Sequence, residues 1–266
     1  MIIDFHTHVF PDKIAGATIN ALSSGAGIPP HSDGTLNGLL SQMERAEISL
    51  SVNLPVLTKA KQFDSILSFA EGINKENSGV ISFAGIHPED EEYDSHLYLV
   101  KEKGIKGIKI HPDYQGTFFD DEKYVKILSL AKKLDLITVT HAGFDGAFVG
   151  QEIKCTPFRV LNLLDKIGGY DKLVLAHLGG NELYNDAFEM LAGEDVYFDT
   201  SYVLPFLNKN QLEQMILKHG EEKILFASDS PWQGQDTMVK IIKDCKLGKS
   251  VENKIFCENA KKLLNI

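Results

Sequence analysis

Short apolar segments recur along the chain, and the spacing between them leaves room for one amphipathic helix each time. The apolar segments predict eight strands, at residues 2–6, 49–55, 80–87, 105–111, 135–141, 172–177, 195–200 and 223–229. Apolar residues three and four apart predict helices between them, at residues 36–47, 61–76, 94–103, 121–133, 157–167, 183–192 and 209–219. Eight strands that alternate with helices indicate an α/β fold with a parallel sheet, and that number favours a closed (β/α)8 TIM barrel over an open doubly wound sheet.

The length of 266 residues and the lack of a low-complexity linker favour one domain, spanning residues 1–266. The connection after the first strand is long, from Val9 to Leu36, and it contains the run Ser23-Ser24-Gly25. We expect a loop there, and two alternatives stand about even: a lid over the barrel mouth or a plain mobile surface loop.

The charge balance limits the kinds of partner. Lys and Arg number 27 against 37 Asp and Glu, for a formal net charge of −10, which argues against nucleic acid or an anionic membrane as the main partner. We expect a small-molecule substrate, with a homodimer as the default oligomeric state. The cysteines are odd in number and form no C-x-x-C pair, no apolar run has the length of a membrane span, and a strand begins at residue 2. These features predict a cytoplasmic protein.

Histidine and aspartate close many of the predicted strands. The strand-end residues are His6, His8, His87, His111, His141, His177 and Asp229. In a parallel barrel these ends share one rim, where active sites are built. Buried imidazoles need hydrogen-bond partners and add little as core fillers, so their concentration at one rim indicates a functional site.

The pair His6 and His8 lies two residues apart at a strand end, so both imidazoles face the same way and can bind one metal ion. Random placement of nine histidines in 266 residues gives about 0.3 such pairs, so the pair alone is weak. Asp229 closes the last strand, which adjoins the first in a closed barrel, and His141 can complete a set that leaves one position for water. His177, from the next strand, is either a further ligand or a general acid/base.

Several motifs in this order resemble the amidohydrolase superfamily, and more narrowly the amidohydrolase-related branch that includes aminocarboxymuconate semialdehyde decarboxylase. The segments that carry the resemblance are His6-Thr7-His8, His141-Ala142-Gly143, Ala176-His177-Leu178-Gly179-Gly180 and Phe226-Ala227-Ser228-Asp229-Ser230-Pro231-Trp232. The resemblance covers nearly the whole chain, through the closing helix Glu258–Leu264, and it does not name a substrate.

The resemblance implies a distorted barrel with one divalent metal ion, usually zinc, at the carboxyl-terminal mouth. His6, His8, His141 and Asp229 match its metal ligands, and His177 matches a histidine that assists proton transfer. Such an ion lowers the pKa of bound water toward about 7. In this scheme Asp229 orients the water and accepts its proton, and His177 polarises the substrate or carries the proton to the leaving group.

Lys109, near the end of the fourth strand, leaves the number of metal ions open, because binuclear members of the superfamily place a carboxylated lysine in this region. It shares strand parity with His111, so both should face the same way. We expect one metal ion, with Lys109 and His111 binding substrate.

For other residues near the rim, the sequence gives less reason to expect a role in the site. We expect Asp4 to support the site from deeper in the barrel and Trp232 to line the mouth or pack beneath it. His87 is as well suited to capping a loop as to a role in the site. Asp145 and Glu152 can contact substrate or an additional metal ion, but we favour a solvated acidic loop for both. Arg159 is expected in a surface ion pair.

The primary hypothesis is a metal-dependent hydrolase that acts on an amide, ester, lactone or related bond of a small molecule. The alternative is a non-oxidative decarboxylase on the same scaffold, in which the metal ion and His177 stabilise a carbanion-like or protonated intermediate. A metal-free lactonase is a further alternative, because a fold does not determine chemistry. A non-catalytic binding protein is disfavoured, because every expected ligand is present.

Overall fold

Parallel strands form the centre of the computed structural model, which describes residues 1–266. The strands are β1 (Ile3–Thr7), β2 (Leu50–Asn53), β3 (Val80–Ser82), β4 (Ala84–Gly85), β5 (Gly107–Ile110), β6 (Ile137–Thr140), β7 (Leu173–Leu175), β8 (Tyr197–Asp199) and β9 (Ile224–Leu225). Each pairs in parallel with the next in chain order, in the runs β1-β2-β3 and β4 to β9. Only Phe83 separates β3 from β4, and its N–H donates to the Asn53 carbonyl at 2.9 Å. The two therefore form one interrupted strand, and all eight predicted strands are present.

Backbone hydrogen bonds join the last strand to the first. The Phe5 N–H donates to the Phe226 carbonyl at 2.9 Å, and the Asp229 N–H donates to the His6 carbonyl at 2.8 Å. A sheet joined in this way has no open edge. The predicted (β/α)8 barrel is confirmed, and its seam brings the ends of the first and last strands together.

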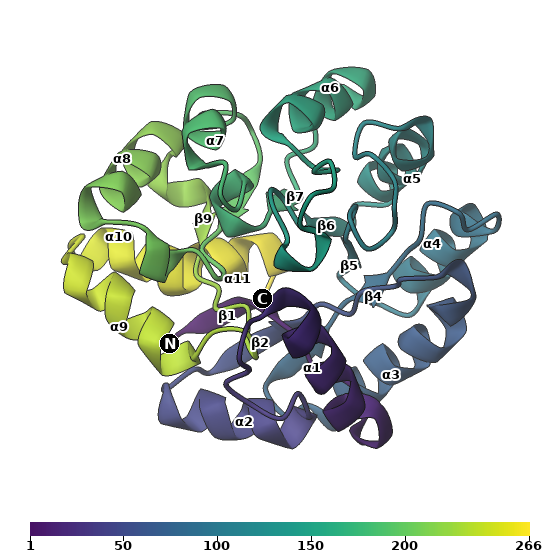
Figure 1. Cartoon of the computed structure of the whole chain (residues 1–266), viewed down its shortest axis with the longest axis horizontal. Coiled ribbons are helices and arrows are strands. Elements are labelled where there is room, and N and C mark those ends of the chain that lie inside the picture. Colours follow the sequence, from purple (N-terminus) through teal and green to yellow (C-terminus); the bar gives the residue numbers. More distant parts are fainter.

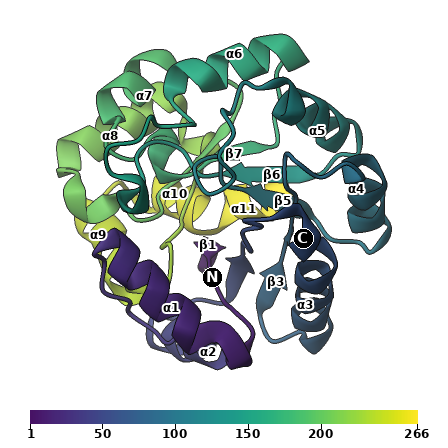
Figure 2. The same cartoon turned by 45° about the vertical axis from the view of Figure 1, so that its right-hand side comes forward.

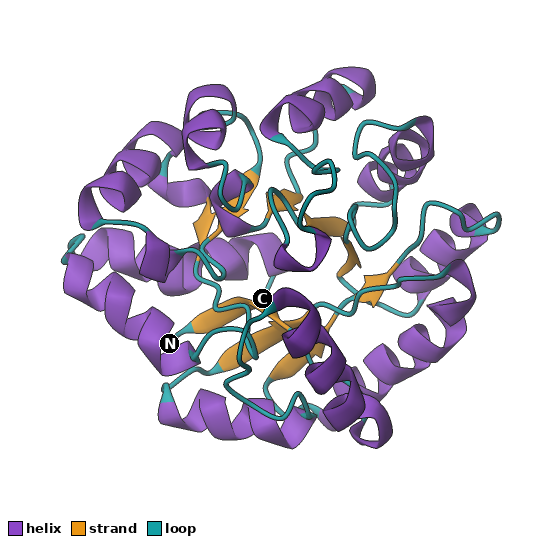
Figure 3. Ribbon diagram, viewed as in Figure 1, coloured by secondary structure: helices purple, strands orange, loops and turns teal.

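Helices surround the strands (Figure 3). They are α2 (Leu36–Arg45), α3 (Phe63–Glu76), α4 (Tyr93–Glu102), α5 (Glu122–Lys133), α6 (Pro157–Ile167), α7 (Tyr184–Met190), α8 (Lys209–His219), α9 (Gln235–Cys245), α10 (Lys249–Asn253) and α11 (Asn259–Leu264). All seven predicted helices are present. Polar residues begin several of them: the side chains of Thr35, Asp121, Thr156 and Asn208 each accept a hydrogen bond from a first-turn N–H.

Shorter helical turns occupy the connections. They are η1 (Ala60–Gln62), η2 (Gly146–Phe148), η3 (His177–Gly179), η4 (Leu204–Phe206), η5 (Glu221–Lys223) and the π-helical η6 (Lys254–Glu258). No helix of the structure combines the length and the apolar character that crossing a lipid bilayer requires.

The connection after β1 contains a helix, so the expectation of a loop is wrong there. This helix, α1, spans Asp12–Ala26 and buries Ala15 and Ile19, which lie four residues apart on one face. It lies in front of the strands in Figure 1, and its end meets η2 on the other side of the barrel mouth. In the turned view of Figure 2, α1 (dark purple) passes in front of α2. Part of the barrel mouth is therefore covered by a packed helix.

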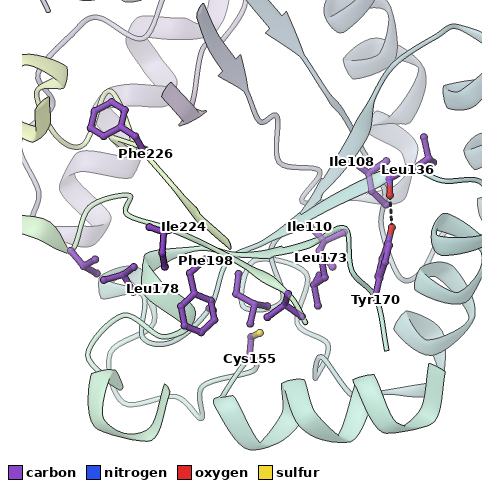
Figure 4. Packing of buried hydrophobic residues seen from close by; sticks show 14 of the residues in the cluster. Ile108, Ile110, Leu136, Cys155, Tyr170, Leu173, Leu178, Phe198, Ile224 and Phe226 are labelled. Atoms are coloured by element: carbon purple, nitrogen blue, oxygen red, sulfur yellow. Dashed lines mark hydrogen bonds between the residues drawn. The ribbon is translucent and has the colours of Figure 1, made fainter. Parts of the chain in front are cut away.

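Two apolar clusters form the core. The outer cluster of 51 buried residues lies between strands and helices, and Figure 4 shows Ile108 and Ile110 within it. The inner cluster of 15 residues fills the barrel, where Phe5 packs among strand residues and Leu263 of α11 contributes from the final helix. Side chains alternate along a strand, so Lys109, between Ile108 and Ile110, faces the barrel interior.

Candidate active site

A cavity of about 440 Å³ opens at the carboxyl-terminal ends of the strands. Its lining includes all seven predicted site residues, His6, His8, Lys109, His111, His141, His177 and Asp229. The structure thus brings these residues to one cavity. Their chemical roles stay predictions.

Three of the predicted metal ligands meet at the seam between β9 and β1. His6 Nε2 and His8 Nε2 lie 3.2 Å apart. Asp229 Oδ1 lies 3.5 Å from His6 Nε2 and 3.2 Å from His8 Nε2. The backbone hydrogen bond across the seam therefore fixes the carboxylate beside both imidazoles.

Hydrogen bonds on the far side of each ring decide where the protons lie. His6 Nδ1 lies 2.8 Å from Asp199 Oδ2, and His8 Nδ1 lies 2.8 Å from the Leu54 carbonyl oxygen. Both oxygens accept, so both δ nitrogens donate, and each neutral ring is left with a lone pair on Nε2. Burial lowers the pKa of His6 well below its usual value, which favours the neutral ring.

Two nitrogen lone pairs and a carboxylate oxygen thus converge, and none of these three atoms carries a proton to donate to the other two. Such donors repel one another unless a cation lies between them. Neutral imidazole and carboxylate are ordinary ligands of divalent metal ions, and a hydrogen bond that fixes the far ring nitrogen is typical of a metal-binding histidine. The donor set of His6, His8 and Asp229 therefore fits a divalent metal ion.

Lys109 lies beside His6, one of these three candidate metal ligands. Its Nζ is 3.1 Å from His6 Nε2, and its side chain is buried. Burial lowers the pKa of Lys109 to about 8, against the opposing effect of the nearby Asp199 and Asp229 charges. His6 Nε2 has a single lone pair, so a metal ion bound there and a hydrogen bond from Lys109 exclude each other.

His141, the fourth predicted ligand, lies outside this group. Its Nδ1 is 3.0 Å from His177 Nε2, and its own Nε2 is buried without a hydrogen-bond partner. His177 Nδ1 lies 2.9 Å from the Ser201 carbonyl oxygen and so donates. It follows that His177 Nε2 accepts from His141 Nδ1, and the unpartnered His141 Nε2 carries a lone pair. A buried lone pair without a donor is costly, and a cation would remove that cost.

The structure groups His141 with His111 and Asp145, whose ligand atoms lie within 4.8 Å of one another. The His111 and His141 rings are stacked with centroids 4.1 Å apart, and His111 Nε2 lies 3.2 Å from Asp145 Oδ2. Asp145 also begins η2 by accepting from the Ala147 N–H at 2.8 Å. The expectation that Asp145 is a solvated loop residue is wrong, because it lines the cavity.

Asp199, at the end of β8, is the residue that the sequence interpretation missed. Its Oδ2 holds His6 Nδ1, while its Oδ1 accepts from the backbone N–H groups of His177 and Ser201, both at 3.0 Å. One buried carboxylate thus orients both a candidate metal ligand and the candidate acid/base. The available signal was its position, because Asp199 closes its strand as Asp229 closes the last one.

Two of the candidate residues have left-handed backbone conformations. The φ angles are +60° for His177 and +70° for Asp229. Such values are uncommon for residues other than glycine and are found where surrounding contacts hold them. Here the contacts are the hydrogen bond from His177 N–H to Asp199 and the one from Asp229 N–H to His6. The strained backbone turns both side chains into the cavity lining.

Trp232 follows its sequence expectation, and Asp4 follows its own only in part. Asp4 lies between Ile3 and Phe5 of the inner cluster, so it supports the site from the side of α9 and not from deeper in the barrel. Asp4 is buried and accepts from the Ser228 N–H at 2.9 Å and from Gln235 Nε2 at 2.7 Å, so it braces the segment that leads to Asp229. Burial raises the pKa of Asp4 to about 6. Trp232 lines the cavity.

Two other residues have structural roles. His87 Nδ1 accepts from the Glu89 N–H at 3.1 Å, which makes it a loop cap. Arg159 pairs with Asp120 at 2.8 Å and Glu152 at 2.9 Å, the expected ion pair.

Comparison with solved structures shows the same fold in several enzymes. A 2,6-dihydroxybenzoate decarboxylase from Rhizobium is 16% identical, with a TM-score of 0.71 over 99% of this chain and 98% of that chain. A 5-carboxyvanillate decarboxylase from Novosphingobium aromaticivorans, complexed with manganese and 4-hydroxy-3-methoxy-5-nitrobenzoic acid, is 15% identical, with a TM-score of 0.74 over 100% and 96%. A structure described as amidohydrolase II is 17% identical, with a TM-score of 0.74 over 100% of both chains.

No protein of curated function matches the sequence. The family model described as amidohydrolase matches residues 3–266, which is nearly the whole chain. This match shows that the chain belongs to the amidohydrolase family, as the strand-end motifs indicated.

Proposed function

We propose that this chain is a metal-dependent, non-oxidative decarboxylase of a small carboxylic acid. Hydrolysis is the primary hypothesis from the sequence, but two of the three similar structures above are decarboxylases. The main support for the proposal is the position of Lys109 in the cavity. It is the only lysine or arginine that lines the cavity, and it lies on the floor beside the candidate metal ligands.

The proposed metal site consists of His6 Nε2, His8 Nε2 and Asp229 Oδ1. A divalent ion bound there supplies a Lewis acid that draws the negative charge of the substrate toward the floor. Mixed nitrogen and oxygen donors accept zinc and manganese alike. The sequence favours zinc, and the manganese in the Novosphingobium decarboxylase makes manganese the first alternative.

Lys109 binds the substrate carboxylate in this proposal. With a pKa of about 8 it is mostly protonated at neutral pH, and an ion pair in a buried site is screened less than one on the surface. Burial disfavours a charged carboxylate relative to neutral carbon dioxide. The Lys109 side chain thus fixes the orientation of the carboxylate, while the surrounding cavity favours its departure as carbon dioxide.

The proton that replaces the carboxyl group comes from His177 in this proposal, which requires a proton on His177 Nε2 in place of the hydrogen bond that this nitrogen accepts from His141 Nδ1. The bond between the substrate carbon and the carboxyl carbon breaks, its electron pair stays on the substrate carbon, and a proton forms the new C–H bond. The overall change is R–COO⁻ + H⁺ → R–H + CO₂. The carboxylate of Asp199 accepts from the His177 and Ser201 backbone N–H groups and so positions the His177 ring.

Hydrolysis is the second candidate function. Asp229 lies where it can accept a proton from water at the same site, and one similar structure is described as an amidohydrolase. The two candidates differ in their products, because only decarboxylation releases carbon dioxide.

The test is a panel of aromatic and unsaturated acids, and a parallel panel of amides, esters and lactones, offered to protein loaded with zinc or manganese. We expect carbon dioxide release from the acids and its loss in Asp229→Asn, with the exposed substitution Glu189→Gln as the control. Hydrolysis of the second panel without carbon dioxide release from the first contradicts the proposal and supports the second candidate. The homodimer and the cytoplasmic location stay predictions.

A further inference from the structure

The cavity extends well beyond the groups that the proposed chemistry uses. Its volume of about 440 Å³ lies within the range of about 300–1,000 Å³ typical of small-molecule sites. The catalytic and metal-binding candidates occupy the floor, at the ends of the strands. The walls above them come from α1 and α3.

One face of α1 lines this upper part. Ile14, Thr18, Leu22 and Ala26 all contact the cavity, and residues four apart lie in one row along a helix. A different pair, Ala15 and Ile19, anchors α1 to the protein. The row from Ile14 to Ala26 is therefore not needed to hold the helix in place.

Three of the four side chains in the row are apolar, the fourth is the uncharged Thr18, and the row is incompletely covered. Ile14 is 51% exposed, and the other three residues are half-buried. A single exposed apolar side chain is normal, but three apolar side chains on one helix face that lines a cavity indicate a ligand-binding surface.

The facing wall has the same character. Ile66 and Phe69, three apart on α3, line the cavity and are partly buried against the outer core cluster. None of the residues that α1 and α3 contribute to the lining is charged. The charged groups lie on the floor and at Asp145.

We propose that these two walls form a binding subsite for an apolar substituent of the substrate, an alkyl chain or a second ring, on the side away from the reacting carboxyl group. The substrate is then an amphiphilic acid, larger and more apolar than a single-ring hydroxybenzoate. Its carboxylate occupies the floor and its apolar part lies between Ile14 and Leu22 of α1 and Phe69 of α3. The identification of the floor as the carboxylate end rests on the proposed function.

Equilibrium binding of a series of 4-alkylbenzoates, from benzoate to 4-hexylbenzoate, tests this subsite without turnover. Trp232 is the only tryptophan and lines the cavity, so its fluorescence reports binding to protein loaded with manganese. Burial of one methylene corresponds to about a four-fold gain in affinity. We expect the affinity to rise by up to that factor with each of the first methylenes and then to level off as the cavity fills.

Substitutions on the two faces of α1 supply the controls. Leu22→Asp is expected to abolish the dependence on chain length, and Ile14→Ser, at a more exposed position, is expected to weaken it while leaving the fold intact. Ala17→Asp, exposed and outside the lining, should keep the full dependence. Equal affinities along the series, or a dependence that both lining variants retain, would overturn the subsite.

The outcomes separate this inference from the proposed function. A chain-length dependence in a protein that releases no carbon dioxide from any acid supports the subsite and contradicts the decarboxylase. Release of carbon dioxide from single-ring acids, with no chain-length dependence in binding, supports the decarboxylase and contradicts the subsite.

Discussion

Asp199 Oδ2 accepts a hydrogen bond from His6 Nδ1 at 2.8 Å, and both side chains are buried. This contact leaves the lone pair of the His6 ring on Nε2, where it faces His8 and Asp229. It also links the candidate metal ligand to His177, whose backbone N–H donates to the other oxygen of the same carboxylate. The predicted metal site and the predicted acid/base thus share one positioning residue.

Asp199→Asn tests that role. An amide has one accepting oxygen for four donors, namely the His6 ring, the His177 and Ser201 backbone N–H groups and the Ser201 hydroxyl, so the His6 ring loses its fixed orientation. We expect metal affinity to fall about 10- to 100-fold, as for other residues that orient a metal ligand. Competition with a chelator measures the affinity. Asp195→Asn, on the exposed side of the same segment, is the control, and an unchanged affinity in Asp199→Asn would remove Asp199 from the site.

Lys109→Met separates substrate binding from metal binding. The substitution removes the only basic side chain of the cavity lining and also the hydrogen bond that competes for His6 Nε2. We therefore expect the KM for an acid substrate to rise about ten-fold or more, while metal affinity stays equal or increases. Steady-state kinetics and metal titration measure the two effects. A wild-type metal content near two ions per chain that falls to one in this variant would instead show that Lys109 bridges two ions.

His177→Gln is expected to reduce kcat by about 10²- to 10⁴-fold, the usual range for loss of a general acid or base. Metal content should be retained, because His177 Nε2 is already engaged by His141. Elemental analysis of the purified variant checks this point. Loss of the metal ion together with activity would make His177 a ligand.

His219 predicts a pH dependence of stability away from the site. It is buried, stacks on Phe198 at 3.8 Å and lies with its Nε2 3.0 Å from the Val196 carbonyl oxygen, to which it donates. Burial lowers the pKa of His219 from its usual 6.5 to about 4. Between these values the unfolded chain binds the proton and the folded chain does not, so stability falls as the pH falls from 6.5 toward 4.

The size of this effect follows from the shift. A difference of about 2.5 pKa units corresponds to about 3 kcal/mol of unfolding free energy at full titration. Urea unfolding at pH 7 and pH 4.5 should show a smaller difference for His219→Gln than for the wild type. His31→Gln, at an exposed position, should behave as the wild type does, and an identical pH dependence in all three proteins would contradict the prediction.

Most of the fold follows from the sequence, because parallel barrel strands are buried on both faces and read as short apolar runs. The exception is α1. Gly16, Ser23 and Ser24 lower its intrinsic helix propensity, and the burial of Ala15 and Ile19 stabilises it instead. That contribution is tertiary, and two buried positions four residues apart form too short a pattern to predict the helix.

The sequence predicted which residues belong to the site better than it predicted how they contact one another. Strand-end position identified six of the seven predicted residues that line the cavity, and the resemblance to the superfamily added Lys109. The same strand-end signal also selected His87, which caps a loop instead. The position of a proton on a ring, and the grouping of His141 with His111 and Asp145, depend on contacts between strands distant in sequence. Asp199 went unrecognised because the interpretation followed histidines, and a single strand-end aspartate carries little signal alone.

The most direct test of the central claim is the dependence of carbon dioxide release on metal content. Protein stripped with a chelator should be inactive toward its acid substrate, and activity should rise in proportion to added manganese or zinc until about one ion is bound per chain. His6→Ala and Asp229→Asn should prevent that recovery. Carbon dioxide release at the full rate by protein holding less than about 0.1 ion per chain would contradict the account.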